Sequence, residues 1–306
     1  MKIIIIIPVF NRRVTTLNCL RQLQVVEHAG IDLTTVVVDD ASTDGTKEAI
    51  SSEYPDVVII DGGGDLWWTG GINAGVNYAL GHDFDYTLFL NDDLELDMNF
   101  LMEIVSVARI FPDALVSGVK LLKQNSDKEK IVASVFRRVG WLKEIVDPYS
   151  GMLYDVLSND NYLSADILTG AALLTPVKVY RKIGKLDEKR FPHNWGDLEF
   201  TLRASQAGFQ CLVATKAKIY VDGDNPNYHN RYLVESSRIQ YLKNIFDNHK
   251  YTYGFGRIWN WAFMHRPFYV AWVLFIKKSV VLCGLVFFKT ILPHDFFAKK
   301  FNRDSV

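Results

Sequence analysis

Two adjacent carboxylates follow a short apolar run in the first third of the chain. Residues 86–90 are typical of a buried strand, and Asn91, Asp92 and Asp93 come directly after them. In open α/β sheets the carboxyl ends of strands are where ligands bind. Neighbouring acids repel each other unless a positive charge lies between them, and a divalent cation on a substrate diphosphate is the usual neutraliser. The sequence therefore predicts a metal-dependent enzyme that acts on a nucleotide.

Two earlier strands are expected to end at the same edge of the sheet. β-Branched runs at residues 3–7 and 33–39 flank a stretch of helical periodicity, which predicts a βαβ unit. The residues at the ends of these runs are Pro8, Phe10, Asn11, Asp39 and Asp40. A carboxylate at Asp40 can accept the imide N–H of uracil or thymine, and Phe10 can pack on the base. The alternative is that Asp39 and Asp40 cap the next helix or form a turn.

A glycine-rich loop at residues 62–75 leads from a third strand into a helix that is expected to open near Gly70. Its candidate ligand contacts are Trp68, Gly71 and Asn73. Glycines permit close approach of the backbone to a ligand, and the helix N-terminus that follows favours an anion. The loop lacks the spacing of a Walker loop or a dinucleotide fingerprint, so by itself it indicates little. Trp68 either faces the ligand or fills core space.

The positions of these motifs require an α/β fold. Strands alternate with helices up to residue 119, which predicts a parallel sheet covered on both faces. Residues 94–110 have the pattern of one helix, and residues 120–165 lack a clean period, which favours a substrate-facing insertion. The remaining elements expected are a strand at 171–175, a helix opening at Pro176, a helix at 197–207, and strands at 210–213 and 217–221.

The order of these motifs resembles the family 2 glycosyltransferases of the GT-A fold, most closely the branch of rhamnosyltransferases and galactofuranosyltransferases. The segments that carry the resemblance are PVFNR, VVVDDASTDGT, GGGDLWWTGGINAG and LNDD, and it extends over about residues 1–245. It implies a Rossmann-like, mostly parallel central sheet flanked by helices. In that fold residues 1–250 form the transferase domain, with the nucleotide-sugar half at 1–119 and the acceptor half at 120–250.

The resemblance also implies roles on the donor side. Asp40 would contact the base, Asp92 the ribose or diphosphate, and Asp93 a Mg²⁺ or Mn²⁺ ion. Since Asn91 stands at the first position of the acid motif, the ion would have fewer charged protein ligands. The other donor-side residues implied are Pro8, Phe10, Asn11, Trp68, Gly71, Asn73 and Arg238. The positions that match a further metal ligand are Asp222 and, less favourably, His229.

A segment at residues 193–203 resembles the acidic stretch of the family that holds the general base. That role maps to Asp197, while Gly196 replaces the preceding acid. Asp197 and Glu199 would fall in the first turn of a helix, where the helix dipole favours anions. The alternative is that Asp197 caps the helix and that Glu199 pairs with Arg203 on the surface. The acceptor-side residues implied are Gly170, Ala171, Trp195 and Glu199.

The C-terminal region differs from the rest of the chain in charge and composition. Residues 257–306 hold eight Lys or Arg against two Asp, whereas the whole chain has a net charge of -1. Apolar pieces at 268–276 and 279–288 are separated by Lys277 and Lys278, and each is shorter than the roughly 20 residues of a spanning helix. Residues 251–306 are therefore expected to form amphipathic, aromatic-rich helices on an anionic membrane surface. The alternative is the interface of a homodimer.

Composition narrows the compartment and the partners. Three distant cysteines support neither a disulfide framework nor a zinc site, and the near-neutral charge disfavours a nucleic-acid partner. The apolar run at residues 3–7 is too short for a signal peptide. The expected protein is a peripheral one on the cytoplasmic face of the inner (plasma) membrane.

The resemblance implies an inverting glycosyltransferase with a nucleotide-diphosphate sugar as donor. The loop favours L-rhamnose from dTDP-rhamnose, while UDP-hexoses stay open because one carboxylate serves thymine and uracil alike. The acceptor would be a glycan or an undecaprenyl-diphosphate-linked sugar in bacterial cell-surface glycan synthesis. The alternatives are a sugar-phosphate nucleotidyltransferase and a non-catalytic nucleotide-sugar-binding subunit.

Overall fold

The computed structural model describes residues 1–123, 129–157, 159–221 and 254–291. Its strands are β1 (Lys2–Val9), β2 (Asp32–Asp39), β3 (Val58–Asp61), β4 (Tyr86–Leu90), β5 (Glu95–Leu96), β6 (Leu115–Lys123), β7 (Glu129–Ile131), β8 (Arg137–Val139), β9 (Glu144–Val146), β10 (Tyr162–Ala165), β11 (Ala172–Pro176) and β12 (Cys211–Val221). Its helices are α1 (Arg13–Val25), α2 (Thr46–Glu53), α3 (Trp67–Leu80), α4 (Phe100–Ile110), α5 (Val177–Ile183), α6 (Gly196–Gln206), α9 (Phe255–Met264), α10 (Phe268–Ile291) and the 3-10 turn η1 (Tyr154–Leu157).

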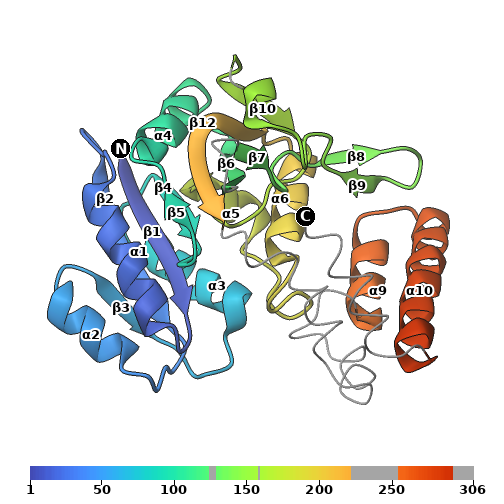
Figure 1. Cartoon of the computed structure of the whole chain (residues 1–306), viewed down its shortest axis with the longest axis horizontal. Helices are drawn as coiled ribbons and strands as arrows, with labels where there is room; N and C mark the ends of the chain where they lie inside the picture. The colour runs from blue at the N-terminus through green and yellow to red at the C-terminus, as the bar shows by residue number, and fades with distance from the viewer. Residues whose placement is uncertain (124–128, 158, 222–253, 292–306) are drawn as a thin grey trace.

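A mixed sheet runs through the molecule in the order β10-β12-β6-β11-β4-β1-β2-β3. β1 pairs in parallel with β2 and β4, and β2 pairs in parallel with β3. β11 runs antiparallel to β4 and β6, and β12 runs parallel to β6. Figure 1 shows helices on either side of this sheet. The predicted α/β class with a helix-flanked central sheet is confirmed, and the antiparallel β11 divides its two parallel parts.

The apolar run at residues 3–7 is explained by cover on both faces of β1. Ile3, Ile5 and Ile7 pack in the core formed with α1, α2 and α4. Ile4 and Ile6 pack on the other face, against α3 and the core that α5 and α6 complete. Each of these side chains is at most 1% exposed. A strand buried on both faces has no solvent side to fill with polar residues, so its sequence is continuously apolar.

Two predicted helix boundaries are wrong. α3 begins at Trp67 rather than near Gly70. Residues 94–99 form no helix, because β5 pairs there with β12 and α4 begins only at Phe100. The pairing that decides this segment comes from a strand more than a hundred residues later, which local periodicity does not report.

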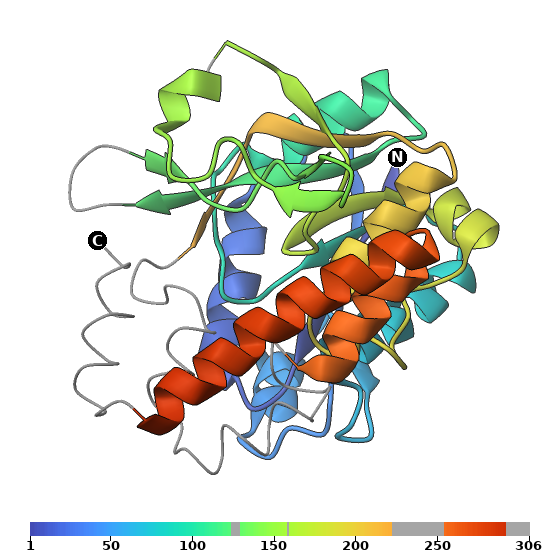
Figure 2. The same ribbon diagram turned by 90° about the vertical axis from the view of Figure 1, so that its right-hand side faces the viewer.

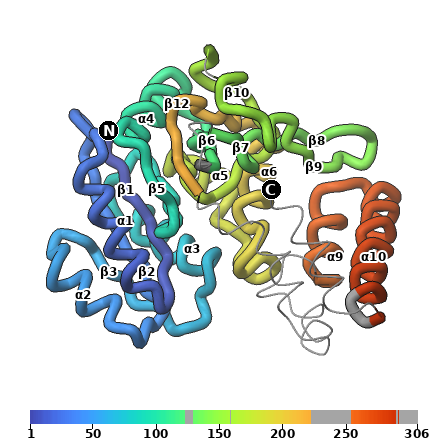
Figure 3. Tube along the Cα trace, in the orientation of Figure 1, coloured from blue at the N-terminus to red at the C-terminus, as the bar shows by residue number. Residues whose placement is uncertain are grey.

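The second half of the sheet also differs from expectation. The strands predicted at 210–213 and 217–221 are one strand, β12, with a shift of register between Ala214 and Lys218. Part of the predicted insertion extends the sheet, since β7 pairs with β6 and β10 with β12. β8 and β9 form a separate hairpin. Figures 1 and 3 show this hairpin projecting from the sheet toward α9 and α10.

α9 and α10 lie side by side and pack on the body of the protein through α6 and the loop before it (Figures 1 and 2). Trp261 of α9 contacts Phe191 and Trp195 edge to face, at 6.4 and 5.5 Å between ring centroids. The buried residues of this contact are Ile167, Phe191, Leu202, Trp261, Ala262, Ala271 and Leu274. The C-terminal helices are thus part of the folded core rather than a loose extension.

α10 is one continuous helix, so the prediction that Lys277 and Lys278 separate two short pieces is wrong. Its stretch Phe268–Phe288 has a mean hydropathy of 2.0 and is long and apolar enough, by length and composition, to cross a membrane. Only 22% of its most apolar window is buried. The exposed residues at spacings of three or four, which share one side of the helix, are Tyr269, Trp272, Val273, Ile276, Val280, Phe287 and Ile291.

Candidate functional site

Four residues with left-handed backbone lie where strands end or helices begin at one edge of the sheet. Asn11 and Ala41 follow β1 and β2 with φ of 51° and 61°, and Trp67 and Trp195 lie at the starts of α3 and α6 with φ of 54° and 70°. Residues other than glycine adopt this conformation at a cost of about 1–3 kcal/mol each. Such residues cluster at ligand sites, so this edge is the candidate functional site.

The loops after β1 and β2 are tied together by Asn11. Its backbone N–H donates to Ser42 Oγ at 2.9 Å, and its side-chain Oδ1 accepts the N–H of Thr43 at 2.7 Å. The side chain predicted to touch a donor therefore shapes the loops that border the site. Phe10, next to it, is 53% exposed, which leaves its ring accessible to a flat ligand.

Asp40 organises the glycine-rich loop. Its Oδ1 accepts the N–H of Gly64 at 2.7 Å, and its Oδ2 accepts those of Leu66 and Trp67 at 2.9 and 3.2 Å. A Cβ on Gly62 would lie 2.6 Å from Asp40 Oδ1, so the loop approaches this carboxylate too closely for any side chain there. Contact of Asp40 with a base stays a prediction, and in the structure the carboxylate first holds the loop.

Asp39 makes the turn that sequence reasoning offered as its alternative role. Its Oδ1 accepts the N–H of Ser42 at 2.9 Å, and the side chain is 3% exposed. An acid followed by a polar turn residue commonly makes this bond. The turn alternative is confirmed for Asp39.

A guanidinium lies between the two acids after β4. Arg12 Nε is 3.0 Å from Asp92 Oδ1, and its Nη2 is 3.2 Å from Asp93 Oδ2. Thr16 donates its hydroxyl to Asp92 Oδ2 at 3.0 Å. Burial raises the pKa of Asp92 and the charge of Asp93 adds to this, while Arg12 and Thr16 oppose the shift. The positive charge that the acid pair requires is therefore supplied within the chain.

The acid motif can hold a metal ion only if the substrate supplies further ligands to that ion. Asn91 Oδ1 accepts the indole N–H of Trp68 at 2.9 Å, and Asp92 is 6% exposed and engaged by Arg12. Asp93 is 46% exposed and can present an oxygen to an ion. Within the described ranges, no three His, Cys, Asp or Glu side chains gather as a metal site. Mg²⁺ is often held by one carboxylate together with substrate phosphates and water.

Three residues predicted from sequence lie outside the described part of the chain. They are Asp222 and His229, proposed as metal ligands, and Arg238, expected near the diphosphate.

Trp68 joins the acid motif to Asp197. A Cβ on Gly170 would lie 2.4 Å from Trp68 Cη2 and 2.9 Å from Asp197 Cβ, so Gly170 packs closely against both side chains. The backbone N–H of Asn91 donates to Ala171 O at 3.0 Å, which fixes the end of β4 beside the residue before β11. The structure thus brings the predicted Asn91, Trp68, Gly170, Ala171 and Asp197 together.

Asp197 has a surrounding suited to a proton acceptor. Its Oδ2 accepts the N–H of Gly170 at 2.6 Å and its Oδ1 that of Leu198 at 2.9 Å. Burial raises the pKa of Asp197, while these two N–H groups and the charge of Lys120 oppose the rise. A carboxylate with a raised pKa is a better base than an exposed one. Lys120 on β6 was not among the residues predicted from sequence.

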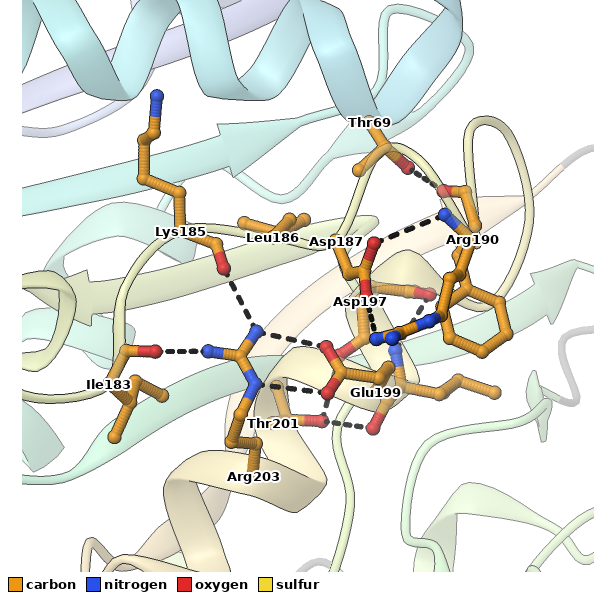
Figure 4. A network of polar contacts seen from close by, with 12 residues as sticks. Thr69, Ile183, Lys185, Leu186, Asp187, Arg190, Asp197, Glu199, Thr201 and Arg203 are labelled. Carbon is orange, nitrogen blue, oxygen red and sulfur yellow. Dashed lines mark hydrogen bonds and ion pairs between the residues drawn. The ribbon is translucent and has the colours of Figure 1, made fainter. Parts of the chain in front are cut away.

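Gly196 has no room for the acid that the resemblance places there. A Cβ on Gly196 would lie 2.5 Å from Thr69 Oγ1 and 3.1 Å from Phe191 O. Thr69 donates its hydroxyl to Phe191 O at 2.6 Å, a bond drawn in Figure 4. The start of α6 is therefore pressed against the start of α3, and glycine is the residue that permits this approach.

Two residues predicted on the donor side serve packing. Gly71 lets α3 approach β1, because a Cβ there would lie 2.8 Å from Pro8 Cβ. Asn73 is 4% exposed, donates to Leu186 O and Glu188 Oε2 at 2.9 and 2.7 Å, and accepts the N–H of Leu186 at 3.1 Å. All the polar atoms of Asn73 are engaged, which argues against a direct donor contact.

Glu199 lies in an internal ion pair instead of facing an acceptor (Figure 4). It is 0% exposed and accepts from Arg203 Nε and Nη2, both at 2.9 Å. His265, after α9, lies 3.1 Å from Glu199 Oε1. Arg203 also donates to Ile183 O and Lys185 O. The alternative of a pair with Arg203 is confirmed, although the pair is internal and not on the surface. The burial of Glu199 argues against the acceptor role.

Sequence reasoning missed the residues that hold Asp92. Arg12 directly follows the strand-end residue Asn11, and Thr16 lies one helical turn later on the same side of α1. This spacing was the available signal, because a strand end followed by a cation and a hydroxyl can serve an acid at the next strand end. Neither residue stands out by itself.

The structure thus has a helix-flanked α/β sheet with acids at neighbouring strand ends. The sequence of residues 4–163 matches the family described as Glycosyl transferase family 2. The chain belongs to this family, whose members use nucleotide-sugar donors and glycan acceptors. The matched range contains Asp40, Asp92 and Asp93, whereas Asp197 lies beyond it.

One curated relative has a name that states the kind of sugar it transfers. The chain is 24% identical over 234 residues to the low-salt glycan biosynthesis hexosyltransferase Agl10 of Haloferax volcanii, an overlap of 67% of this chain and 70% of the relative. The name of this relative describes a hexosyltransferase of glycan biosynthesis.

Proposed function

We propose that the protein is an inverting glycosyltransferase of the GT-A type that transfers a sugar to a lipid-linked or polysaccharide acceptor. The observation that carries this proposal is the close packing of Gly170 against both Trp68 and Asp197, together with the bond from Trp68 to Asn91. A proton acceptor and an acid motif that can serve a diphosphate are thus connected through Trp68 and Gly170. A non-catalytic binding subunit would not need this partly buried carboxylate with a raised pKa.

In the proposed reaction Asp197 takes the proton of the acceptor hydroxyl. The hydroxyl oxygen forms a bond to the anomeric carbon from the side opposite the leaving group, and the bond from that carbon to the diphosphate oxygen breaks. The electron pair leaves with the nucleoside diphosphate, so one displacement inverts the configuration. A Mg²⁺ or Mn²⁺ ion held by Asp93 would supply charge stabilisation to the departing diphosphate.

For the donor we propose dTDP-rhamnose, with UDP-hexoses as the second candidate. Phe10 is exposed and can cover a pyrimidine, and the N–H of Asp40 donates at 2.9 Å to the carbonyl of Val9, the residue before Phe10. The relative from Haloferax volcanii carries the name of a hexosyltransferase, which supports a six-carbon sugar.

A donor screen tests this proposal. Thermal shifts of the full chain should be measured with dTDP-rhamnose, UDP-hexoses and the free nucleotides, with and without Mn²⁺, because a ligand of the folded state raises its stability. We expect the largest rise with a pyrimidine nucleotide sugar, followed by release of nucleoside diphosphate when acceptor is added. Release of pyrophosphate from a sugar phosphate and a nucleotide would instead indicate a nucleotidyltransferase.

We further propose that the protein is peripheral on the cytoplasmic membrane face, with α10 along the surface. Lys277 lies ten residues into α10, about 15 Å along its axis. Its Nζ is 2.7 Å from Glu144 Oε1 on β9. If α10 crossed the bilayer, this contact would draw an open-edged hairpin into hydrocarbon, where its backbone groups would lack partners. The contact therefore supports a helix that lies on the membrane.

Replacing Arg12 by alanine should strengthen Mn²⁺ binding in the absence of donor about three- to tenfold. Arg12 neutralises one of the two acid charges, so its removal leaves Asp93 unpaired and more attractive to a cation. Electron paramagnetic resonance of free Mn²⁺ measures the affinity. The matched control is Arg13→Ala, which removes an equal charge from the next residue. Equal Mn²⁺ affinity in both variants would contradict the proposed competition.

A further inference from the structure

The turn of the β8–β9 hairpin holds a tryptophan in solvent. Trp141 is 63% exposed, and Val139 and Val146 on the two strands are 43% and 40% exposed. The turn is well defined, because the N–H of Lys143 donates to Gly140 O at 3.2 Å and both residues have positive φ. An indole has an apolar body and one polar N–H, which suits it to the boundary between water and an apolar partner.

Three contacts fix this turn beside the first half of α10. Arg266, two residues before the helix, donates from Nε to Leu142 O at 3.2 Å and from Nη2 to Lys143 O at 3.0 Å. Within α10, Lys277 pairs with Glu144 at 2.7 Å. Figures 1 and 3 show the hairpin and α10 on the same side of the molecule. These contacts hold the turn against the helix.

The hairpin and the helix present a shared exposed apolar surface, which we call the hairpin–helix patch. Each member is at least 37% exposed, and the members are Trp141, Phe268, Tyr269, Trp272, Val273 and Ile276. Aromatic residues dominate it, as they do at membrane interfaces.

The positive charge around the hairpin–helix patch favours an anionic lipid surface over a second copy of the chain. Residues 137–146 and 266–278 hold six Lys or Arg and a single acid, Glu144. Arg266 is buried and Lys277 pairs with Glu144, which leaves four further cations around the patch. The hydrogen bond from Lys277 lowers the pKa of Glu144, and the charges of Lys278 and Arg266 lower it further. A second copy of the chain would bring a like-charged rim against this one, whereas anionic lipid headgroups complement it.

We propose that the hairpin–helix patch binds the surface of an anionic lipid bilayer, with Trp141 entering the interfacial layer beside α10. This inference rests on the membrane association proposed for α10 and adds a second point of contact. Two contacts on a rigid body fix one orientation on the membrane, which a single helix does not. Part of the insertion predicted to face the sugar substrate then faces lipid.

Co-sedimentation of the full chain with vesicles tests the proposal. The vesicles contain phosphatidylcholine with a quarter of phosphatidylglycerol, and phosphatidylcholine alone serves as the uncharged comparison. Trp141→Ser should weaken partitioning about tenfold, since it removes one large apolar side chain from the interface. The matched control is Ile110→Ser, which alters a residue of α4 that is 64% exposed, and it should bind as the wild type does.

A second variant separates this inference from membrane association itself. Ile276→Ser alters only α10, so binding lost in this variant and unchanged in Trp141→Ser overturns the role of the hairpin and leaves the helix as anchor. If the wild-type protein sediments with neither kind of vesicle, the proposed membrane association is overturned as well. A wild-type dimer that dissociates on Trp141→Ser, without vesicle binding, assigns the patch to a second copy and also overturns the proposal.

Discussion

Asp197→Asn should lower sugar transfer about 10²- to 10⁴-fold while donor binding survives. The amide lacks the basic oxygen that takes the acceptor proton. It keeps one oxygen that can accept the N–H of Gly170, which in the wild type lies 2.6 Å from Asp197 Oδ2. The start of α6 should therefore stay in place. Single-turnover transfer with labelled donor measures the first effect, and calorimetric titration of donor measures the second.

The pH dependence gives an independent test of Asp197. Burial raises its pKa, so the rate should fall on acidification at a pH above the ordinary aspartate value of about 3.9. A carboxyl whose pKa is raised in the folded state stabilises the fold below the ordinary value and loses that contribution as pH rises. Asparagine never carries the charge, so the stability of the variant should lack this dependence on pH.

A neighbouring acid provides the control. Asp187 lies in the loop before α6 and accepts from Arg190 at 2.9 Å, so Asp187→Asn removes a nearby carboxylate whose side-chain bonds are with Arg190. This variant should keep transfer within a few-fold. Wild-type turnover in Asp197→Asn would refute the assignment of the base, and loss of donor binding would show that the variant disturbs the donor side.

The gathering of Phe10, Asp40 and Asp93 at one edge was predictable because its information is local. Phe10 and Asp40 directly follow β1 and β2, and Asp93 lies three residues after β4, so each strand end and its candidate residue appear together in the sequence. Parallel pairing of β1 with β2 and β4 then brings the ends to one edge. Sequence order and sheet geometry suffice for this step.

The remaining roles depend on contacts between distant segments. Asn73 is saturated by a loop 113 residues away, and Glu199 by His265, 66 residues away. Sequence reasoning saw polar residues at helix starts and assigned them to ligands. In the same way, Lys277 within α10 pairs with Glu144 on a hairpin whose position the sequence does not reveal. Tertiary partners decide whether such polar residues face a ligand or the interior.

Glu199→Gln should lower the melting temperature by about 5–10 °C. The substitution keeps the shape of the side chain and removes its charge, which leaves the guanidinium of Arg203 partly buried without its carboxylate. Arg203 retains its bonds to Ile183 O and Lys185 O, so the loss should fall near the lower end for a broken buried pair, about 3 kcal/mol. Differential scanning calorimetry of the full chain measures it.

An exposed ion pair provides the control for the change in melting temperature. Lys2 and Asp83 lie 2.7 Å apart with side chains 48% and 93% exposed, so Asp83→Asn should leave the melting temperature almost unchanged. If Glu199 instead contacted the acceptor, Glu199→Gln would raise the acceptor KM at an unaltered melting temperature. The two measurements together distinguish an internal partner of α9 and α6 from an acceptor ligand.

The effect of Glu199→Gln should also depend on pH in a defined direction. Burial acts to raise the pKa of Glu199, but the hydrogen bonds from His265 and Arg203 outweigh it and lower the pKa. A carboxyl with a lowered pKa stabilises the fold above its ordinary value of about 4.3 and loses this contribution as pH falls through the folded value. The gap in melting temperature between wild type and variant should therefore be widest near neutral pH and narrow below about pH 4. A gap that is constant with pH would mean that the loss comes from packing, because only the charged form of Glu199 distinguishes it electrostatically from glutamine.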